Sequence, residues 1–102
     1  MRYYARKVFK SYLNQLCNAH SNNRFTERGI RKRLEILRVL VMFKGELSST
    51  EIRERVGFKS RRVLWYYLND LEGMGLIMVV SKTNHGSLIR ITLKGRILFE
   101  RV

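Results

Sequence analysis

The sequence has few of the residues on which disulfide-bonded, metal-binding or membrane-spanning proteins depend. Its 102 residues contain no proline and a single cysteine, so no disulfide can close within the chain. Nothing in it resembles a Cys/His metal set, and no signal-peptide block opens it. The apolar runs, such as residues 39–43, are far shorter than the ~20 residues of a membrane helix. We therefore expect a soluble cytoplasmic protein, held together by packing alone, without a cofactor or a metal.

Residues that could support catalysis are also scarce. The two histidines, His20 and His85, both stand in polar, turn-like segments. No Ser/His/Asp order, phosphate-binding glycine loop or pair of buried carboxylates can be assembled from the chain. The sequence predicts a protein that is not an enzyme.

Acidic residues are few and basic residues are abundant. The chain has 21 Lys and Arg against 8 Asp and Glu, a net charge of +13, and a pI near 10.8. Residues 1–33 alone contain nine basic residues and one acidic residue. Such a charge favours a polyanionic partner, with nucleic acid ahead of an acidic membrane surface or an acidic protein. The alternative is that the charge only keeps the surface solvated.

The apolar content, 45%, is sufficient for one compact domain, which we place at residues 25–102. Residues 1–24 form a basic, amphipathic N-terminal segment, with a helix predicted from about residue 3 to 17. We expect its apolar face to pack on the next helix, within one subunit or across the two-fold axis of a homodimer. An anionic membrane surface is the alternative that we favour least. The candidate dimerisation residues are Tyr4, Val8, Phe9, Tyr12, Leu13 and Leu16.

The next segment predicts a helix with two apolar stripes. Thr26 is a suitable N-cap and Gly45 a suitable stop, so we expect the helix over about residues 27–43. At 3.6 residues per turn both stripes require a cover, one from the domain core and the other from the N-terminal helix or a second subunit. The stripes are Ile30, Leu34, Leu37 and Val41, and Ile36, Leu40 and Phe43.

Residues 48–75 predict two helices joined by a tight turn. Ser48 to Glu51 matches a capping box, which starts a short helix ending near Val56, and Gly57 allows the chain to turn. A second helix is predicted from about Ser60, at residues 60–74, with Gly73 or Gly75 at its end. This is the helix-turn-helix pattern.

The period of the pattern changes after Gly75. Residues 76–81 and 87–92 are apolar, β-branched or alternating, and the residues between them favour a turn, so we predict a β-hairpin. Thr92 can cap a last helix over 93–102. The predicted fold class is mainly α with a small β-hairpin wing, preceded by the extra N-terminal helix.

Three stretches carry a family resemblance: EIRERVGF at 51–58, LEGMGLI at 71–77 and ITLKGR at 91–96. Residues 26–102 resemble winged helix-turn-helix transcription regulators of the broad MarR and ArsR kind, including small versions from archaea and their viruses. The resemblance implies the fold and DNA binding. It implies no effector, because the ligand-sensing and metal-sensing residues of those families have no counterpart that we can place here. Residues 1–24 are outside the shared pattern, although MarR-like proteins do use terminal helices to dimerise.

The predicted recognition helix, residues 60–74, divides into two arcs at 3.6 residues per turn. The arc predicted to be buried holds Val63, Leu64, Tyr67, Leu68, Leu71 and Met74. The arc predicted to face outward holds Arg61, Arg62, Trp65, Tyr66 and Asn69. Arginine pairs with guanine, asparagine pairs with adenine, and an aromatic ring can contact a thymine methyl, so the outward set suits a major groove.

Some of these residues have other interpretations. Lys59 and Ser60, at the start of the helix, are phosphate candidates rather than base readers, and both arginines could also contact phosphates only. Trp65 and Tyr66 could instead be covered by the N-terminal helix or by another subunit.

The predicted wing, about residues 77–93, offers a polar tip for the DNA backbone or the minor groove. Any hairpin tip is polar, so this signal is not specific. The candidate wing residues are Lys82, Thr83, Asn84, His85 and Arg90.

Together these features predict a sequence-specific transcription regulator that binds double-stranded DNA as a homodimer. One alternative is an architectural protein that coats DNA without base selection. The other is a winged-helix interaction module in which Trp65 and Tyr66 dock a protein.

Overall fold

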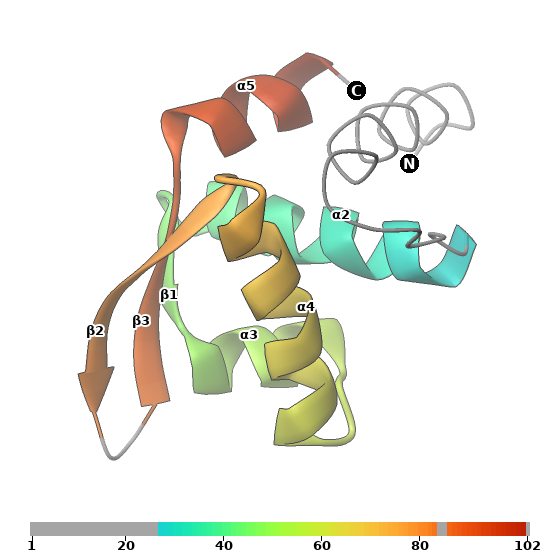
Figure 1. Cartoon of the computed structure of the whole chain (residues 1–102), viewed down its shortest axis with the longest axis vertical. Helices are drawn as coiled ribbons and strands as arrows, with labels where there is room; N and C mark the ends of the chain where they lie inside the picture. Colours follow the sequence, from blue (N-terminus) through green and yellow to red (C-terminus); the bar gives the residue numbers. More distant parts are fainter. Residues whose placement is uncertain (1–26, 84–85, 102) are drawn as a thin grey trace.

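The computed structural model describes residues 27–83 and 86–101. Within them the elements run α2 (Glu27–Met42), β1 (Glu46–Ser48), α3 (Ser49–Val56), α4 (Arg61–Gly73), β2 (Ile77–Thr83), β3 (Gly86–Ile91) and α5 (Leu93–Arg101), as Figure 1 shows. These four helices and one antiparallel sheet confirm the predicted winged helix-turn-helix. The predicted N-terminal helix, its dimerisation residues and the Thr26 cap lie outside the described residues.

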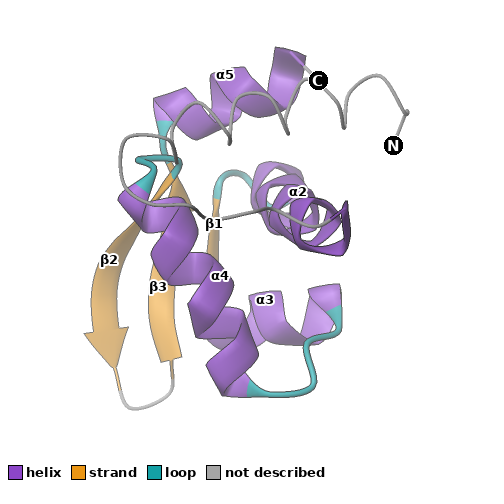
Figure 2. Ribbon diagram, turned by 45° about the vertical axis from the view of Figure 1, so that its right-hand side comes forward, coloured by secondary structure: helices purple, strands orange, loops and turns teal. Residues whose placement is uncertain are grey.

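Helix α2 is the central element, and it contacts α3, α4, α5, β1 and β3 (Figure 2). Ile36, Leu37 and Leu40 have no exposed surface, so both predicted stripes contribute to the core. After the helix, Gly45 has a φ of 90° and its N–H donates to the carbonyl of Leu40 at 2.6 Å. The predicted stop at Gly45 is confirmed, because that left-handed turn ends the helix.

Side-chain caps define the helix-turn-helix. The Ser48 hydroxyl accepts from the N–H of Glu51 at 3.2 Å, and the Ser60 hydroxyl accepts from the N–H of Val63 at the same distance. Between the two helices Gly57 has a φ of 88°, which lets the chain reverse without strain. The cap at Ser48, the turn at Gly57 and a helix start near Ser60 are therefore as predicted, whereas the role of Ser60 as the cap of that helix was not predicted.

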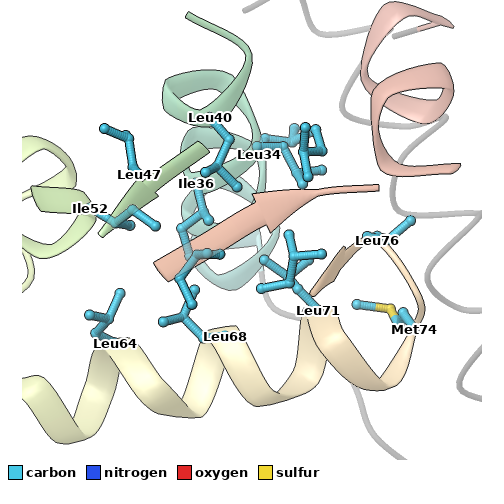
Figure 3. Packing of buried hydrophobic residues seen from close by; sticks show 14 of the residues in the cluster. Leu34, Ile36, Leu40, Leu47, Ile52, Leu64, Leu68, Leu71, Met74 and Leu76 are labelled. Atoms are coloured by element: carbon cyan, nitrogen blue, oxygen red, sulfur yellow. The ribbon is translucent and has the colours of Figure 1, made fainter. Parts of the chain in front are cut away.

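The hairpin belongs to a three-stranded sheet of order β1-β3-β2. Strand β1 was not predicted, because its three residues overlap the cap of α3 and are too few to show a period. Leu47, Ile89 and Val79 form one row across the sheet and lie on its inner face. Leucines of α4 pack against α2 and this face in Figure 3.

The start of helix α5 is hydrogen-bonded to the residues that precede β2. The Thr92 N–H donates to the carbonyl of Leu76 at 3.0 Å, and the Thr92 hydroxyl donates to the carbonyl of Gly75 at 2.6 Å. That hydroxyl also accepts from the N–H of Gly95 at 3.0 Å, which confirms the predicted cap. None of the helices in residues 27–83 and 86–101 has the length and apolar character needed to cross a membrane.

Gly95 and Gly73 give a matched test of this packing. A Cβ at Gly95 would overlap the carbonyl oxygen of Leu76, whereas a Cβ at Gly73 would meet nothing within 4 Å. We expect Gly95→Ala to lower the free energy of unfolding by about 2 kcal/mol or more, because the overlapping atom is backbone. Gly73→Ala should stay within ~1 kcal/mol of the wild type and can be stabilising. Urea unfolding followed by circular dichroism measures both, and equal effects would contradict the close contact.

Candidate nucleic-acid interface

One side of α4 is open to solvent along its whole length. Leu64, Leu68 and Leu71 bury the opposite side in the core. We call the open side the exposed face of α4. It consists of Arg62, Val63, Tyr66 and Asn69, with Arg61 also exposed at the helix start and Glu72 and Gly73 exposed at its end. These positions follow the spacing of three and four residues that places side chains on one side of a helix.

Two of the predicted exposures on this helix are wrong. Val63 was predicted to be buried, but 45% of it is exposed. Trp65 was predicted to face outward, but it is half-buried and packs against the core. Tyr66, by contrast, is 65% exposed, as predicted. Both errors come from assigning exposure by hydropathy, since Val63 and Trp65 lie on nearly opposite sides of the helix and exchange their expected exposures.

A buried charge joins α4 to α2. The Arg33 side chain of α2 is only 4% exposed, and its Nε donates to Oδ2 of Asp70 on α4 at 2.8 Å. The Arg33 guanidinium also lies 4.9 Å from the ring centroid of Tyr67. The ring of Tyr67 lies 5.5 Å from that of Phe58. These contacts hold the side of α4 that carries Tyr67 and Asp70 against α2.

The same ion pair changes the electrostatics of the interface. Asp70 and Glu72 are the two acidic residues of α4, and either would repel a phosphate. The ion pair with Arg33 neutralises the charge of Asp70 and so reduces this repulsion. Among the residues that the structure describes, Arg61 and Arg62 make no ion pair with a carboxylate. The first turn of α4 is therefore strongly positive.

The turn before α4 is held in place by α3. Nη2 of Arg53 donates to the carbonyl of Lys59 at 3.4 Å, and the Phe58 side chain is buried. Lys59 itself is exposed, while the Ser60 hydroxyl is occupied by the cap on Val63. Lys59 thus keeps a position suited to a phosphate, whereas Ser60 serves mainly to start the helix.

The predicted wing residues do not form one group. The Thr83 hydroxyl donates to the carbonyl of Gly86, which closes the hairpin, and Lys82 is exposed beside it. Arg90 lies away from the tip, where its guanidinium contacts Oε1 of Glu46 at 2.7 and 3.0 Å. Its charge is therefore shared with Glu46. Asn84 and His85 lie outside the described residues.

A β-bulge decides on which face of the wing Lys82 lies. Val79 pairs with Ile89, but the next pair is Ser81 with Leu88, so Val80 is an extra residue in β2. Lys82 consequently pairs with the buried Ser87, on the inner face of the sheet. Without the bulge the alternation would place Lys82 on the outer face.

The start of α4 lies at the same end of the molecule as the end of β2 and the start of β3, and α5 lies at the other end (Figure 1). The end with the start of α4 presents a helix with exposed arginines and a strand with an exposed lysine, an arrangement that can enter a groove of a polyanion. Within residues 27–83 and 86–101 there is no group of three His, Cys, Asp or Glu side chains that could hold a metal.

Sequence reasoning missed the pair of Arg33 and Asp70 that joins the interface helix to α2. Arg33 was counted only among the basic residues of 1–33, and Asp70 was given no role in positioning the helix. They are 37 positions apart, so no local period links them. The only available signal was the presence of acidic residues in an otherwise basic helix.

The fold is similar to solved structures of transcriptional regulators. The PcaV regulator from Streptomyces coelicolor is 23% identical, with 95% of this chain and 68% of PcaV covered at a TM-score of 0.62. A MarR-family regulator from Silicibacter pomeroyi is 16% identical, with 95% and 60% covered and a TM-score of 0.61. A mutant MarR from E. coli complexed with operator DNA is 15% identical, with 95% and 61% covered and a TM-score of 0.63.

No protein-family model and no curated protein matches the sequence. The structural likeness therefore establishes the MarR-type winged-helix fold. This chain spans 60–68% of the length of the three structures.

The Arg33–Asp70 pair predicts a specific stability pattern. Arg33→Ala should lower the free energy of unfolding by about 2–4 kcal/mol, because it leaves a partly buried carboxylate without its partner. Arg31→Ala removes an exposed arginine from the same helix and should change it by less than ~0.5 kcal/mol. Combining Arg33→Met with Asp70→Leu should recover most of the loss. Urea unfolding tests all three, and a neutral Arg33→Ala would show that the pair does not hold α4.

Proposed function

We propose that this chain, which has the winged-helix fold of MarR-type regulators, is a transcriptional regulator that binds a specific sequence of double-stranded DNA. Helix α4 enters the major groove, and the wing lies at the backbone or in the adjacent minor groove. The observation that carries the proposal is the exposed face of α4, with Arg62, Tyr66 and Asn69 one turn apart above a layer of buried leucines.

Each of these side chains has a chemical role in this proposal. Arg62 donates two parallel hydrogen bonds to a guanine, and Asn69 pairs with an adenine where the helix still reaches the bases. Tyr66 packs along sugar or base. Arg61 and Lys59 contact phosphates on either side of the helix start and set the register without reading sequence.

The similar structures support this assignment at the level of the fold. The solved neighbours are transcriptional regulators, and one is bound to operator DNA. Together with the net charge of +13, they favour regulation inside the cell over catalysis.

We also propose a homodimer. Leu93 and Ile97, four residues apart on α5, are 74% and 40% exposed at the end of the molecule away from the wing tip. A second copy that covers them leaves both α4 helices open, to enter successive major grooves about 34 Å apart. The N-terminal segment remains a predicted part of this contact.

Selection of binding sites from a random duplex pool, followed by competition and footprinting, tests the proposal. We expect a preference of ~10³ or more for the selected site over random duplex, and a palindromic footprint. Little preference would instead indicate an architectural protein. Capture of a protein partner without salt-dependent DNA binding would overturn the proposal.

Arg62 is the residue whose loss should change specificity. Arg62→Ala should weaken binding to the selected site by about 1–3 kcal/mol and relax the preference at one base pair. Arg38→Ala removes an equally charged, exposed arginine from α2 and should leave the preference unchanged. Titrations with single-base site variants measure both. Uniform weakening of every site by Arg62→Ala would mean that Arg62 contacts only phosphate.

The β-bulge at Val80 predicts that DNA binding depends on which face of the wing carries the charge of Lys82. Exchanging Ser81 and Lys82 keeps the composition and moves the lysine to the outer face. Both this exchange and Lys82→Ala should remove one phosphate contact. We expect each of them to make the plot of log K against log salt less steep by about one. A wild-type slope in the exchanged variant would show that the charge acts from either face.

A further inference from the structure

Val63 is an exposed aliphatic side chain in the first turn of α4. It follows Arg61 and Arg62 directly, three residues after the cap at Ser60, and 45% of it is accessible. A valine costs helix stability relative to unbranched residues, because its side chain loses rotamer freedom. At this position burial in the core does not offset that cost.

The position of Val63 is fixed by the structure. Its N–H donates to the Ser60 hydroxyl at 3.2 Å, so the backbone at the start of α4 is anchored. A β-branched side chain in a helix has one strongly preferred rotamer. Val63 therefore presents its methyl groups in a constant direction.

Tyr66, one turn further on, extends this apolar spot. Its ring lies 5.2 Å from that of Tyr67 in an edge-on arrangement, and Tyr67 in turn contacts Arg33 and Phe58. The spot is small, and the exposed Arg61 and Arg62 precede it in the same helical turn. Two cations so close to a small apolar spot disfavour an apolar protein surface as partner and favour a small apolar group within a polyanion.

The major groove contains one such group, the C5 methyl of thymine. We propose that Val63 is a specificity residue that contacts a thymine methyl, so that the protein distinguishes thymine from other pyrimidines at one position of its site. This inference rests on the proposed DNA binding through α4. It adds an apolar readout to the hydrogen bonds assigned to Arg62 and Asn69.

Replacement of thymine by uracil tests the contact, because it removes the methyl and leaves base pairing unchanged. In the selected duplex each thymine is replaced singly, and binding of the full chain is measured by fluorescence anisotropy. At one thymine per half-site we expect uracil to weaken wild-type binding by about three- to fivefold, the effect of one buried methyl. Val63→Ala should bind the thymine and uracil duplexes equally. Met42→Ala removes another exposed apolar side chain, on α2, and should keep the wild-type ratio.

The ratio of the two affinities is taken within each variant, so it is independent of any difference in the folded fraction. A wild type that binds the selected duplex but shows no uracil effect at any thymine overturns this inference and leaves the proposed function intact. A Val63→Ala variant that keeps the full ratio also overturns it. Absence of any salt-dependent binding to duplex overturns the proposed function and the inference together.

Discussion

The interaction between Arg33 and Asp70 joins the interface helix α4 to the central helix α2 through a buried charge. Leucines on one side of a helix fix which half of it is buried, but they tolerate a range of side-chain arrangements. A charge-assisted hydrogen bond with a buried arginine tolerates far less, because both partners lose solvation unless the geometry is good. The contacts of Tyr67 with Arg33 and with Phe58 add a second constraint on the same side of the helix. The position of the interface helix therefore depends on a charged contact as well as on its buried leucines.

Much of the fold could be predicted from local chemistry. Capping serines, left-handed glycines and the change of period after Gly75 act over a few residues, and they placed α3, α4, the hairpin and α5 close to their observed bounds. The exposures of Val63 and Trp65 could not be predicted in this way. Val63 is apolar and Trp65 is amphipathic, so a hydrophobic pattern assigns the valine to the core. The ion pair of Asp70 could not be predicted either, because its partner Arg33 comes from a distant part of the chain and from a residue type that is seldom buried.

The wing shows the same division between local and distant information. Its two long strands and its turn follow from composition, but β1 and the bulge do not. Strand β1 exists because β3 offers a free edge beside the cap of α3, and three residues give no pattern of their own. The bulge inserts Val80 among residues that all favour strands, so nothing in the sequence marks which one is extra. The sequence pattern therefore predicted that Lys82 lies near the tip of the hairpin, but it did not predict on which face of the sheet Lys82 lies.

The attachment of α5 also has a mechanical consequence. Gly95 lies directly against the Leu76 carbonyl, and Thr92 is hydrogen-bonded to the two residues that precede β2. These backbone contacts leave little space between α5 and the root of the hairpin, so a displacement of one should carry the other with it. A shift of α5 would consequently tilt the hairpin and change the reach of its tip without any rearrangement of the core.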